Sequence, residues 1–266
     1  MEETKQDSAK PPEPEKNIEE DNSSSSSANL KLFGSWASSY THRVQLALKI
    51  KNLAFAYVEE DLTDKSPSLL LHNPIYKKVP VLLAGGRPIP ESLLILHFLD
   101  EAFPGTSPIL PADPFDRAIA RFWAHFAEDR LGPAVAAVFS SSGEAQNAAV
   151  CRVHDELRLI EAELQDGAFA GRRFFAGDRI GLLDIVLGCG SYWLGVFEEV
   201  AGVKLVDAGE FPRFHAWLSD FEEQEVKAII PPFDKLLTYA RGLRQMLLDP
   251  NGDAGGVVAG SAALTV

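Results

Sequence analysis

Residues 33–48 read FGSWASSYTHRVQLAL, a stretch in which a predicted strand ends, hydroxyl groups cluster and a predicted helix begins. The apolar run Leu30–Phe33 stops at Gly34, ahead of three serines. A hydroxyl at such a corner commonly caps the helix, because its oxygen accepts from the first free N–H groups. These N–H groups and the positive end of the helix dipole also favour an anion, such as a thiolate. For Ser38 or Ser39 taken alone, capping is the commoner role.

The composition is that of an ordinary globular chain of 266 residues, 46% hydrophobic and 24% charged, which is long enough for two cores. The net charge of −13 argues against a nucleic-acid partner and against docking on anionic membranes, since both need a basic surface. The most apolar segment, 180–197, holds Asp184 and four glycines. It is therefore interpreted as helix buried in protein and not as a membrane span.

Cysteine content and the N-terminal segment both favour the cytosol. Cys151 and Cys189 are too few for a disulfide scaffold, and no C-x-x-C motif occurs. The first 21 residues lack the apolar core of a secretory signal and are too acidic for a transit peptide. We therefore expect a cytosolic protein.

Strand and helix patterns alternate in the first part of the chain. A second strand is predicted over Phe55–Glu60, and Gly85-Gly86 lies between two short apolar runs, Val81–Leu83 and Pro88–Ile89, as the turn of a hairpin. A helix over Ser92–Ala102 follows. Strand, helix, strand, hairpin and helix in this order form the thioredoxin-like plan.

Strand signals end at Pro104, and the remainder has mainly helical periodicity. Helices are predicted over 118–130, 148–164, 183–200, 212–224 and 232–247. The predicted fold is thus α/β followed by all-α. The expected domains are a disordered acidic and serine-rich arm at 1–28, a thioredoxin-like domain at 29–104, a linker at 105–114, an all-helical domain at 115–248 and a disordered tail at 249–266.

Two further stretches of the first domain have both a structural and a functional interpretation. In Lys77–Val81, a Val-Pro pair preceded by two lysines is either a solvated strand edge or a backbone receptor with cations for a carboxylate. In Pro90–Leu93, Glu91 and Ser92 either form a good helix start or bind an amine and a carboxylate. A thiolate site, a backbone receptor and a Glu-Ser pair together match one small peptide, glutathione.

The chain resembles plant cytosolic glutathione transferases of the tau class over about residues 30–248. The resemblance rests on the order and spacing of several motifs, which are GSWASSYTHRVQLAL, EEDLTDKSPSLLLHNPIYKKVPVLL, PIPESLLILHFLDE, ILPADPFDRAIARFW and FAGDRIGLLDIVLG. It implies an enzyme that conjugates glutathione to apolar electrophiles, in detoxification and stress responses. Some members also reduce organic hydroperoxides. The resemblance further implies a homodimer, with glutathione as co-substrate and no metal or other cofactor.

Roles in glutathione binding follow from the resemblance position by position. The catalytic serine matches Ser38, which would donate a hydrogen bond to the sulfur and favour its thiolate. Glutathione contacts match Ser38, Lys65, Lys78, Val79, Glu91 and Ser92, with a cis bond expected before Pro80. Many tau members have proline where this chain has Ser39, so Ser39 becomes a competitor for the sulfur.

The electrophile pocket implied by the resemblance is apolar and shaped by aromatic side chains. Its residues match Tyr40, Trp123, Phe126, Arg130, Trp193, Tyr239 and Leu243. For Leu243 a core role is the stronger hypothesis, and for the two tryptophans both roles weigh equally. Asp184 is expected to cap a helix that begins after Gly181. His42 and His97 lack partners at metal-ligand spacing and are interpreted as structural or surface residues.

Parts of this sequence pattern also fit two other functions. A thioltransferase or dehydroascorbate reductase needs a cysteine at the strand-to-helix corner, where this chain has Ser38. A non-catalytic carrier of flavonoids or auxin-like acids would use the apolar pocket equally well. The complete set of predicted glutathione contacts favours the enzyme.

Overall fold

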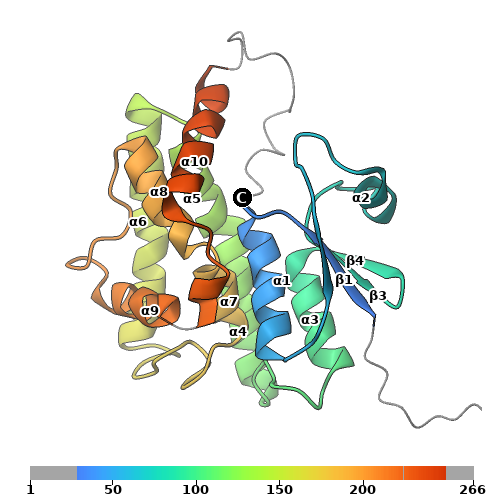
Figure 1. Ribbon diagram of the computed structural model, residues 1–266. Helices are drawn as coiled ribbons and strands as arrows, with labels where there is room; N and C mark the ends of the chain where they lie inside the picture. The colour runs from blue at the N-terminus through green and yellow to red at the C-terminus, as the bar shows by residue number, and fades with distance from the viewer. Residues whose placement is uncertain (1–28, 224, 250–266) are drawn as a thin grey trace, which may run out of the picture.

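The computed structural model describes residues 29–223 and 225–249. Within them a small α/β unit lies beside a larger group of helices (Figure 1). The predicted arm at 1–28, and all of the predicted tail except Asp249, lie outside the described residues. The domain boundaries placed at 29, 104 and 115 remain a prediction.

The sheet contains β1 (Leu30–Gly34), β2 (Ala56–Glu59), β3 (Val81–Ala84) and β4 (Arg87–Pro90). Their spatial order is β2-β1-β3-β4, with β1 and β2 parallel and the other pairs antiparallel. Both glycines of the turn between β3 and β4 have positive φ, which explains why the hairpin turns there. The predicted thioredoxin-like unit is confirmed.

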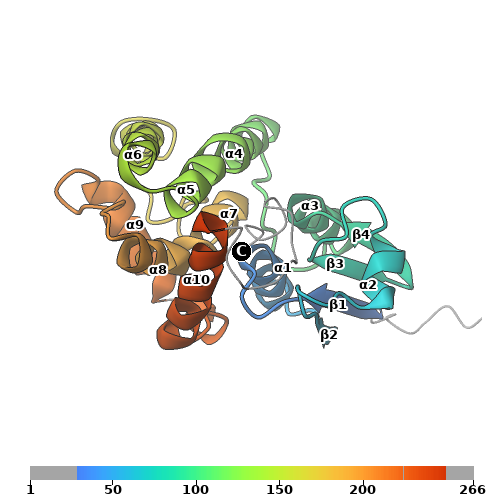
Figure 2. The ribbon, with the colours of Figure 1, turned by 90° about the horizontal axis from the view of Figure 1, so that it is seen from above.

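Helices cover both faces of this sheet, as Figure 2 shows from above. Helices α1 (Ser39–Ile50) and α3 (Ser92–Ala102) lie on the face turned toward the helical unit, and α2 (Pro67–His72) lies on the other. Successive side chains of β1 point alternately to the two faces of the sheet. Leu32 packs in the large core, whereas its neighbour Phe33 packs with Leu69 of α2 in a smaller one.

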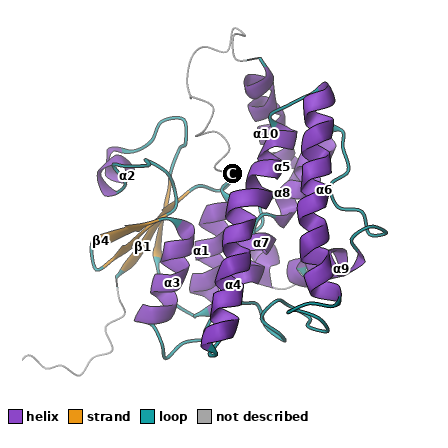
Figure 3. Ribbon diagram, turned by 180° about the vertical axis from the view of Figure 1, so that it is seen from behind, coloured by secondary structure: helices purple, strands orange, loops and turns teal. Residues whose placement is uncertain are grey.

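The second unit is entirely helical in the described residues (Figure 3). Its helices are α4 (Pro114–Phe126), the π-helical turn η1 (Ala127–Leu131), α5 (Gly132–Phe139), α6 (Gly143–Gln165), α7 (Leu182–Gly188), α8 (Ser191–Ala201), α9 (Pro212–Glu222), the short 3-10 helix η2 (Glu225–Ala228) and α10 (Phe233–Leu248). The all-helical expectation is confirmed for this part of the chain.

The predicted ends of two helices were wrong. The helix expected over 183–200 is two helices, because glycines at 188 and 190 lower helix propensity where the chain turns from α7 into α8. Gly188 also permits α9 to approach, since a Cβ there would collide with the ring of Phe221. The helix expected over 118–130 begins at Pro114, capped by Asp113, and changes to a π-turn at Ala127. Helices α2 and α5 were not predicted.

A buried ion pair holds the segment between the two units. Lys51 Nζ lies 2.6 Å from Asp100 Oδ1, and the lysine side chain is 1% exposed. Asp100 also accepts from the backbone N–H groups of Ile109 and Leu110, at 3.0 Å each. The carboxylate therefore ties the end of α3 to the chain leading into α4.

Candidate functional site

The register of the sheet brings the predicted glutathione contacts to one edge. Phe33 at the end of β1 pairs with Val81 at the start of β3, and Val81 pairs with Pro90 at the end of β4. Gly34 pairs with Glu59, so β2 ends there too. The segments that follow β1, precede β3 and follow β4 carry Ser38, Val79 and Glu91, and each leaves the sheet at this edge.

Ser38 is the N-cap of α1, as the capping interpretation predicts. Its Oγ accepts from the backbone N–H of Thr41 at 3.2 Å. Among the described residues none accepts a hydrogen bond from the Ser38 hydroxyl. Capping and catalysis are therefore compatible, because the cap uses the oxygen as acceptor and leaves the proton available to a sulfur anion.

Val79 presents unpaired backbone groups beside a cis peptide bond to Pro80, which confirms the bond geometry expected there. In the described part of the chain, neither the N–H nor the carbonyl of Val79 has a hydrogen-bond partner. Buried backbone groups are nearly always paired, and Val79 is only 4% exposed. An extended peptide bound here would satisfy both groups as an added strand.

Glu91 and Ser92 begin α3 in a strained conformation. Glu91 has φ 71° and ψ 116°, a left-handed backbone that side chains other than glycine rarely adopt. Such strain persists only where the surroundings hold it, and it concentrates at ligand sites. The Glu91 carboxylate is exposed and makes no ion pair with described residues, whereas Ser92 is buried.

Lys65 and Lys78 lie in the segments that lead into α2 and β3. Lys65 precedes Ser66, the N-cap of α2, and Lys78 precedes Val79. Both side chains are half-buried, and neither forms an ion pair within residues 29–223 and 225–249. The carbonyl of Lys78 is held by the Asn73 amide at 3.0 Å, which fixes the backbone next to the cis bond.

Arg43, which the sequence interpretation passed over, joins this edge to the helical unit. Its Nη1 donates to Ser92 Oγ at 3.3 Å and to Glu128 Oε1 at 2.6 Å, and its Nη2 donates to the Val186 carbonyl at 3.0 Å. The guanidinium also lies 4.5 Å from the Tyr40 ring centre. The sequence did contain a signal for a special role of Arg43, because it places a cation near the start of a helix, where the helix dipole disfavours positive charge.

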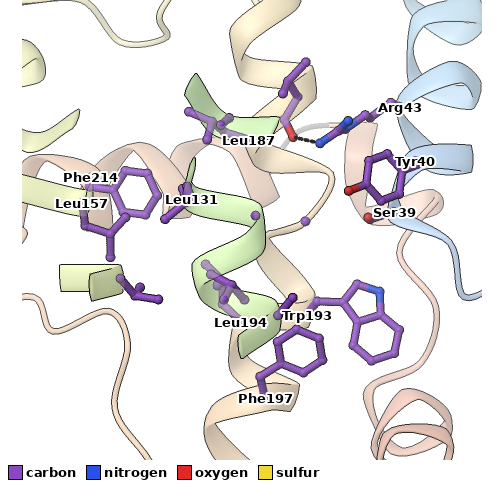
Figure 4. Close-up of a pocket in the computed structure, with 17 residues that line it drawn as sticks. Ser39, Tyr40, Arg43, Leu131, Leu157, Leu187, Trp193, Leu194, Phe197 and Phe214 are labelled. Atoms are coloured by element: carbon purple, nitrogen blue, oxygen red, sulfur yellow. Dashed lines mark hydrogen bonds between the residues drawn. The ribbon is translucent and has the colours of Figure 1, made fainter. Parts of the chain in front are cut away.

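An apolar cavity of about 130 Å³ opens beside α1 (Figure 4). Of the seven residues predicted for the electrophile pocket, Tyr40 and Trp193 line it. Ser39 and Arg43 stand with Tyr40 on one side of the cavity, and Leu157 and Phe214 lie on the opposite side. Leu157 and Phe214 were not expected to line this cavity, because they lie on α6 and α9, far along the sequence from α1.

The other five residues predicted for the electrophile pocket do not line this cavity. Tyr239 packs edge-on against Trp36, with ring centres 5.5 Å apart, and Leu243 is buried in the core of the helical unit. Trp123 and Phe126 pack against each other at 5.0 Å. Arg130 is paired with Glu156 at 2.7 Å.

Contacts between the units hold the loop before Ser38. Trp193 Nε1 donates to the Ala37 carbonyl at 3.1 Å, and His42 Nδ1 contacts the Tyr192 hydroxyl. Burial lowers the pKa of His42 to about 4, so the imidazole is neutral at pH 7. The structural interpretation of His42 is thereby confirmed.

The cysteines do not supply the thiolate of a thioltransferase. Cys189 is fully buried, and burial raises the pKa of its thiol to about 12. Cys151 is exposed on α6, far along the chain from the strand-to-helix corner. The corner itself carries a hydroxyl at Ser38.

Asp184 has the capping role that was expected. Its carboxylate accepts from the Gly181 N–H at 2.9 Å, from the Phe175 and Ala176 N–H groups, and from Trp217 Nε1 at 2.8 Å. Burial raises the pKa of Asp184 to about 6, against the opposing effect of these four donors. The carboxylate thus joins α7, α9 and the loop before α7.

Comparisons with known proteins agree with this architecture. The glutathione S-transferase N-terminal domain model matches residues 32–107, and the C-terminal domain model matches residues 120–225. Glutathione transferase GST 23 of Zea mays is 44% identical over 82% of this chain and 97% of its own length. A probable glutathione S-transferase of Nicotiana tabacum is 45% identical over 83% of this chain and 96% of its own.

Solved structures agree as well. The tau-class glutathione S-transferase from mango has a TM-score of 0.75 and 39% identity, covering 80% of this chain and 97% of its own. A rice glutathione transferase, solved in complex with glutathione, has a TM-score of 0.75 and 35% identity, covering 82% and 97%. The chain belongs to the glutathione S-transferase family, in its tau class.

The described residues contain neither a cluster of metal ligands nor a membrane-spanning helix. They hold no group of three or more His, Cys, Asp and Glu side chains placed to bind a metal ion. No helix within them is both long and apolar enough to span a membrane.

Proposed function

We propose that this transferase binds glutathione along the sheet edge, stabilises its thiolate with the Ser38 hydroxyl and directs it at an electrophilic carbon held against the helical unit. The peptide backbone of glutathione pairs with Val79, its γ-glutamyl amine and carboxylate meet Glu91 and Ser92, and its glycyl carboxylate meets Lys65 and Lys78. A free thiol ionises near about pH 8.5, so a donated hydrogen bond and the helix end raise the share of nucleophile at neutral pH.

The main support for this proposal is that the backbone N–H and carbonyl of Val79 have no hydrogen-bond partner among the described residues. They lie beside the cis bond at Pro80 and at the same sheet edge as Ser38, a spacing that suits an extended tripeptide with its thiol toward α1. A carrier without catalysis would leave both this backbone pair and the free Ser38 proton without a role.

Conjugation of glutathione to chlorodinitrobenzene tests the proposal directly. The purified chain is expected to form the dinitrophenyl adduct with saturation in both substrates. Tight binding of an apolar dye without any adduct would instead identify the chain as a carrier.

Glu91→Gln is expected to weaken glutathione binding about 10- to 100-fold while leaving the fold intact. The substitution removes a charge facing the substrate ammonium, and hydrogen bonds to charged groups contribute about 1.5–3 kcal/mol. Isothermal calorimetry measures the affinity, with Glu101→Gln, an exposed change at the other end of α3, as the matched control. Equal affinities for Glu91→Gln and the unmodified chain would exclude Glu91 from the receptor.

We propose a homodimer that uses the apolar surface of α2 and the turn after it. Leu71, Ile75 and Tyr76 are 73%, 81% and 59% exposed, an apolar group unusual on a monomer surface. Sedimentation should give twice the monomer mass of 29.0 kDa, and Leu71→Glu with Ile75→Glu should shift the protein to monomer. A monomeric unmodified chain would contradict the proposal.

The compartment, cofactors and domain division are also proposals. The cytosol is supported by two unpaired cysteines, which suit a reducing environment. Glutathione as co-substrate is supported by the rice relative, which was solved in complex with glutathione. The division at 29–104, 105–114 and 115–248 is supported by the change from mixed to helical structure after Ala102.

A further inference from the structure

Glu60 is a buried carboxylate at the sheet edge that the proposed glutathione site uses. It directly follows β2 and is only 3% exposed. Its backbone N–H donates to the Gly34 carbonyl at 2.8 Å, which continues the pairing of β2 with the end of β1. Glu60 makes no ion pair with any described residue. A buried carboxylate without a cation is costly unless good hydrogen-bond donors satisfy it.

Both donors to this carboxylate come from a single residue, Ser66. The Ser66 N–H donates to Glu60 Oε2 at 3.0 Å, and the Ser66 hydroxyl donates to Oε1 at 2.7 Å. Ser66 Oγ in turn accepts from the Leu69 N–H at 3.0 Å, which makes Ser66 the N-cap of α2. Because both carboxylate oxygens are engaged in this way, Glu60 fixes the place where α2 begins.

The loop that this contact closes carries Lys65 just before the anchored Ser66. Inside the loop, Asp61 Oδ1 accepts from the Thr63 N–H at 2.8 Å and from its hydroxyl at 2.7 Å, and Leu62 packs against the smaller core. The Lys65 side chain makes no hydrogen bond or ion pair within residues 29–223 and 225–249. The loop therefore fixes the backbone next to Lys65 and leaves its ammonium group for a ligand.

We propose that Glu60 is a positioning residue, which holds Lys65 at the distance from Ser38 that bound glutathione requires. The inference rests on the proposed function, in which Lys65 meets the glycyl carboxylate and Ser38 meets the sulfur. The Glu60 backbone is tied to Gly34, on the segment that leads to Ser38. Its side chain is tied to Ser66, directly after Lys65. Glu60 thus connects the two segments that hold opposite ends of the peptide.

The sign of the charge effect distinguishes positioning from electrostatics. Glu60→Ala removes a negative charge from the segment that carries Lys65. By Coulomb's law alone, this loss would strengthen the binding of an anionic glycyl carboxylate. Positioning predicts the opposite result, since Lys65 would no longer be held where the carboxylate lies.

Glutathione and its glycyl monoethyl ester, which lacks the terminal negative charge, test the inference by calorimetry. Glu60→Ala is expected to lower the affinity for glutathione about 5- to 20-fold, as for coupling within one hydrogen-bond network, and the affinity for the ester less than about twofold. Lys65→Ala should give the same pattern, and the double variant should lose little more than Lys65→Ala alone. Glu60→Gln should restore most of the affinity, because its amide can accept from the Ser66 N–H and donate to the Ser66 hydroxyl.

Glu59→Ala is the matched control, since it removes the same charge from the preceding residue. The Glu59 carboxylate accepts instead from the Trp36 N–H and the Tyr57 hydroxyl, at 2.9 Å each. This variant should change the affinities for glutathione and for the ester by equal factors. Ser66→Ala keeps the backbone donor to Glu60 and loses the hydroxyl, so it should give a smaller loss that is again confined to glutathione.

The outcomes separate this inference from the proposed function. If Lys65→Ala weakens glutathione and the ester equally, or neither, the proposed Lys65 contact is refuted, and the inference with it. If Lys65→Ala acts on glutathione alone but Glu60→Ala weakens both ligands equally, changes neither or strengthens glutathione binding, the inference alone is refuted. Where Glu60→Ala does not fold, Ser66→Ala decides in the same way.

Discussion

Ser38→Ala is expected to lower the rate of glutathione conjugation about 10- to 100-fold at neutral pH, with a much smaller effect on glutathione affinity. The hydroxyl is expected to donate to the sulfur, and a hydrogen bond to an anion contributes about 1.5–3 kcal/mol. Since one pKa unit equals about 1.4 kcal/mol, its loss should raise the thiol pKa by about one to two units. Ultraviolet titration of the thiolate in the binary complex measures that shift.

Two neighbouring serines make this experiment specific. Ser35→Ala removes another buried hydroxyl from the same loop and controls for packing. Ser39→Ala tests the neighbour that stands where many tau members have proline. If Ser39→Ala raises the thiol pKa more than Ser38→Ala does, the hydroxyl that stabilises the thiolate is Ser39. If neither variant moves the pKa, no serine of this corner acts on the sulfur.

Asp184→Ala is expected to lower the free energy of unfolding by about 3–5 kcal/mol, the largest effect on stability that we expect from a polar substitution here. The carboxylate accepts from three backbone N–H groups and the Trp217 indole, and it is fully buried. Alanine would leave all four donors without an acceptor in a dry interior.

Denaturant unfolding monitored by tryptophan fluorescence measures this loss. The matched control is Asp178→Ala, which removes an exposed carboxylate from the loop before α7 and should change the free energy of unfolding by less than about 0.5 kcal/mol. A similarly small change for Asp184→Ala would show that water or rearranged neighbours satisfy the four donors.

The order of elements in the first unit was predictable because its signals are local. Gly85-Gly86 turns the hairpin and Ser38 caps α1, each through backbone chemistry that depends only on nearby residues. The same holds for Asp184, whose place three residues after Gly181 marks a helix start.

Helix ends in the second unit were less predictable. An apolar run such as 183–200 looks like one helix, and the glycines at 188 and 190 were recognisable as the place where the chain turns only once Phe221 was seen to pack against Gly188. The π-turn at Ala127–Leu131 was not predicted either, although Gly132 and Pro133 directly after it disturb a regular helix.

The chain by itself determined the fold class, the family and the segments that reach the sheet edge, because each depends on spacing along the sequence. Tertiary structure alone decided that Arg43 bridges Ser92 and Glu128, and that Leu157 and Phe214 line the same cavity as Tyr40. These contacts join residues tens of positions apart. Their geometry depends on how whole helices pack, which periodicity in a single helix does not specify.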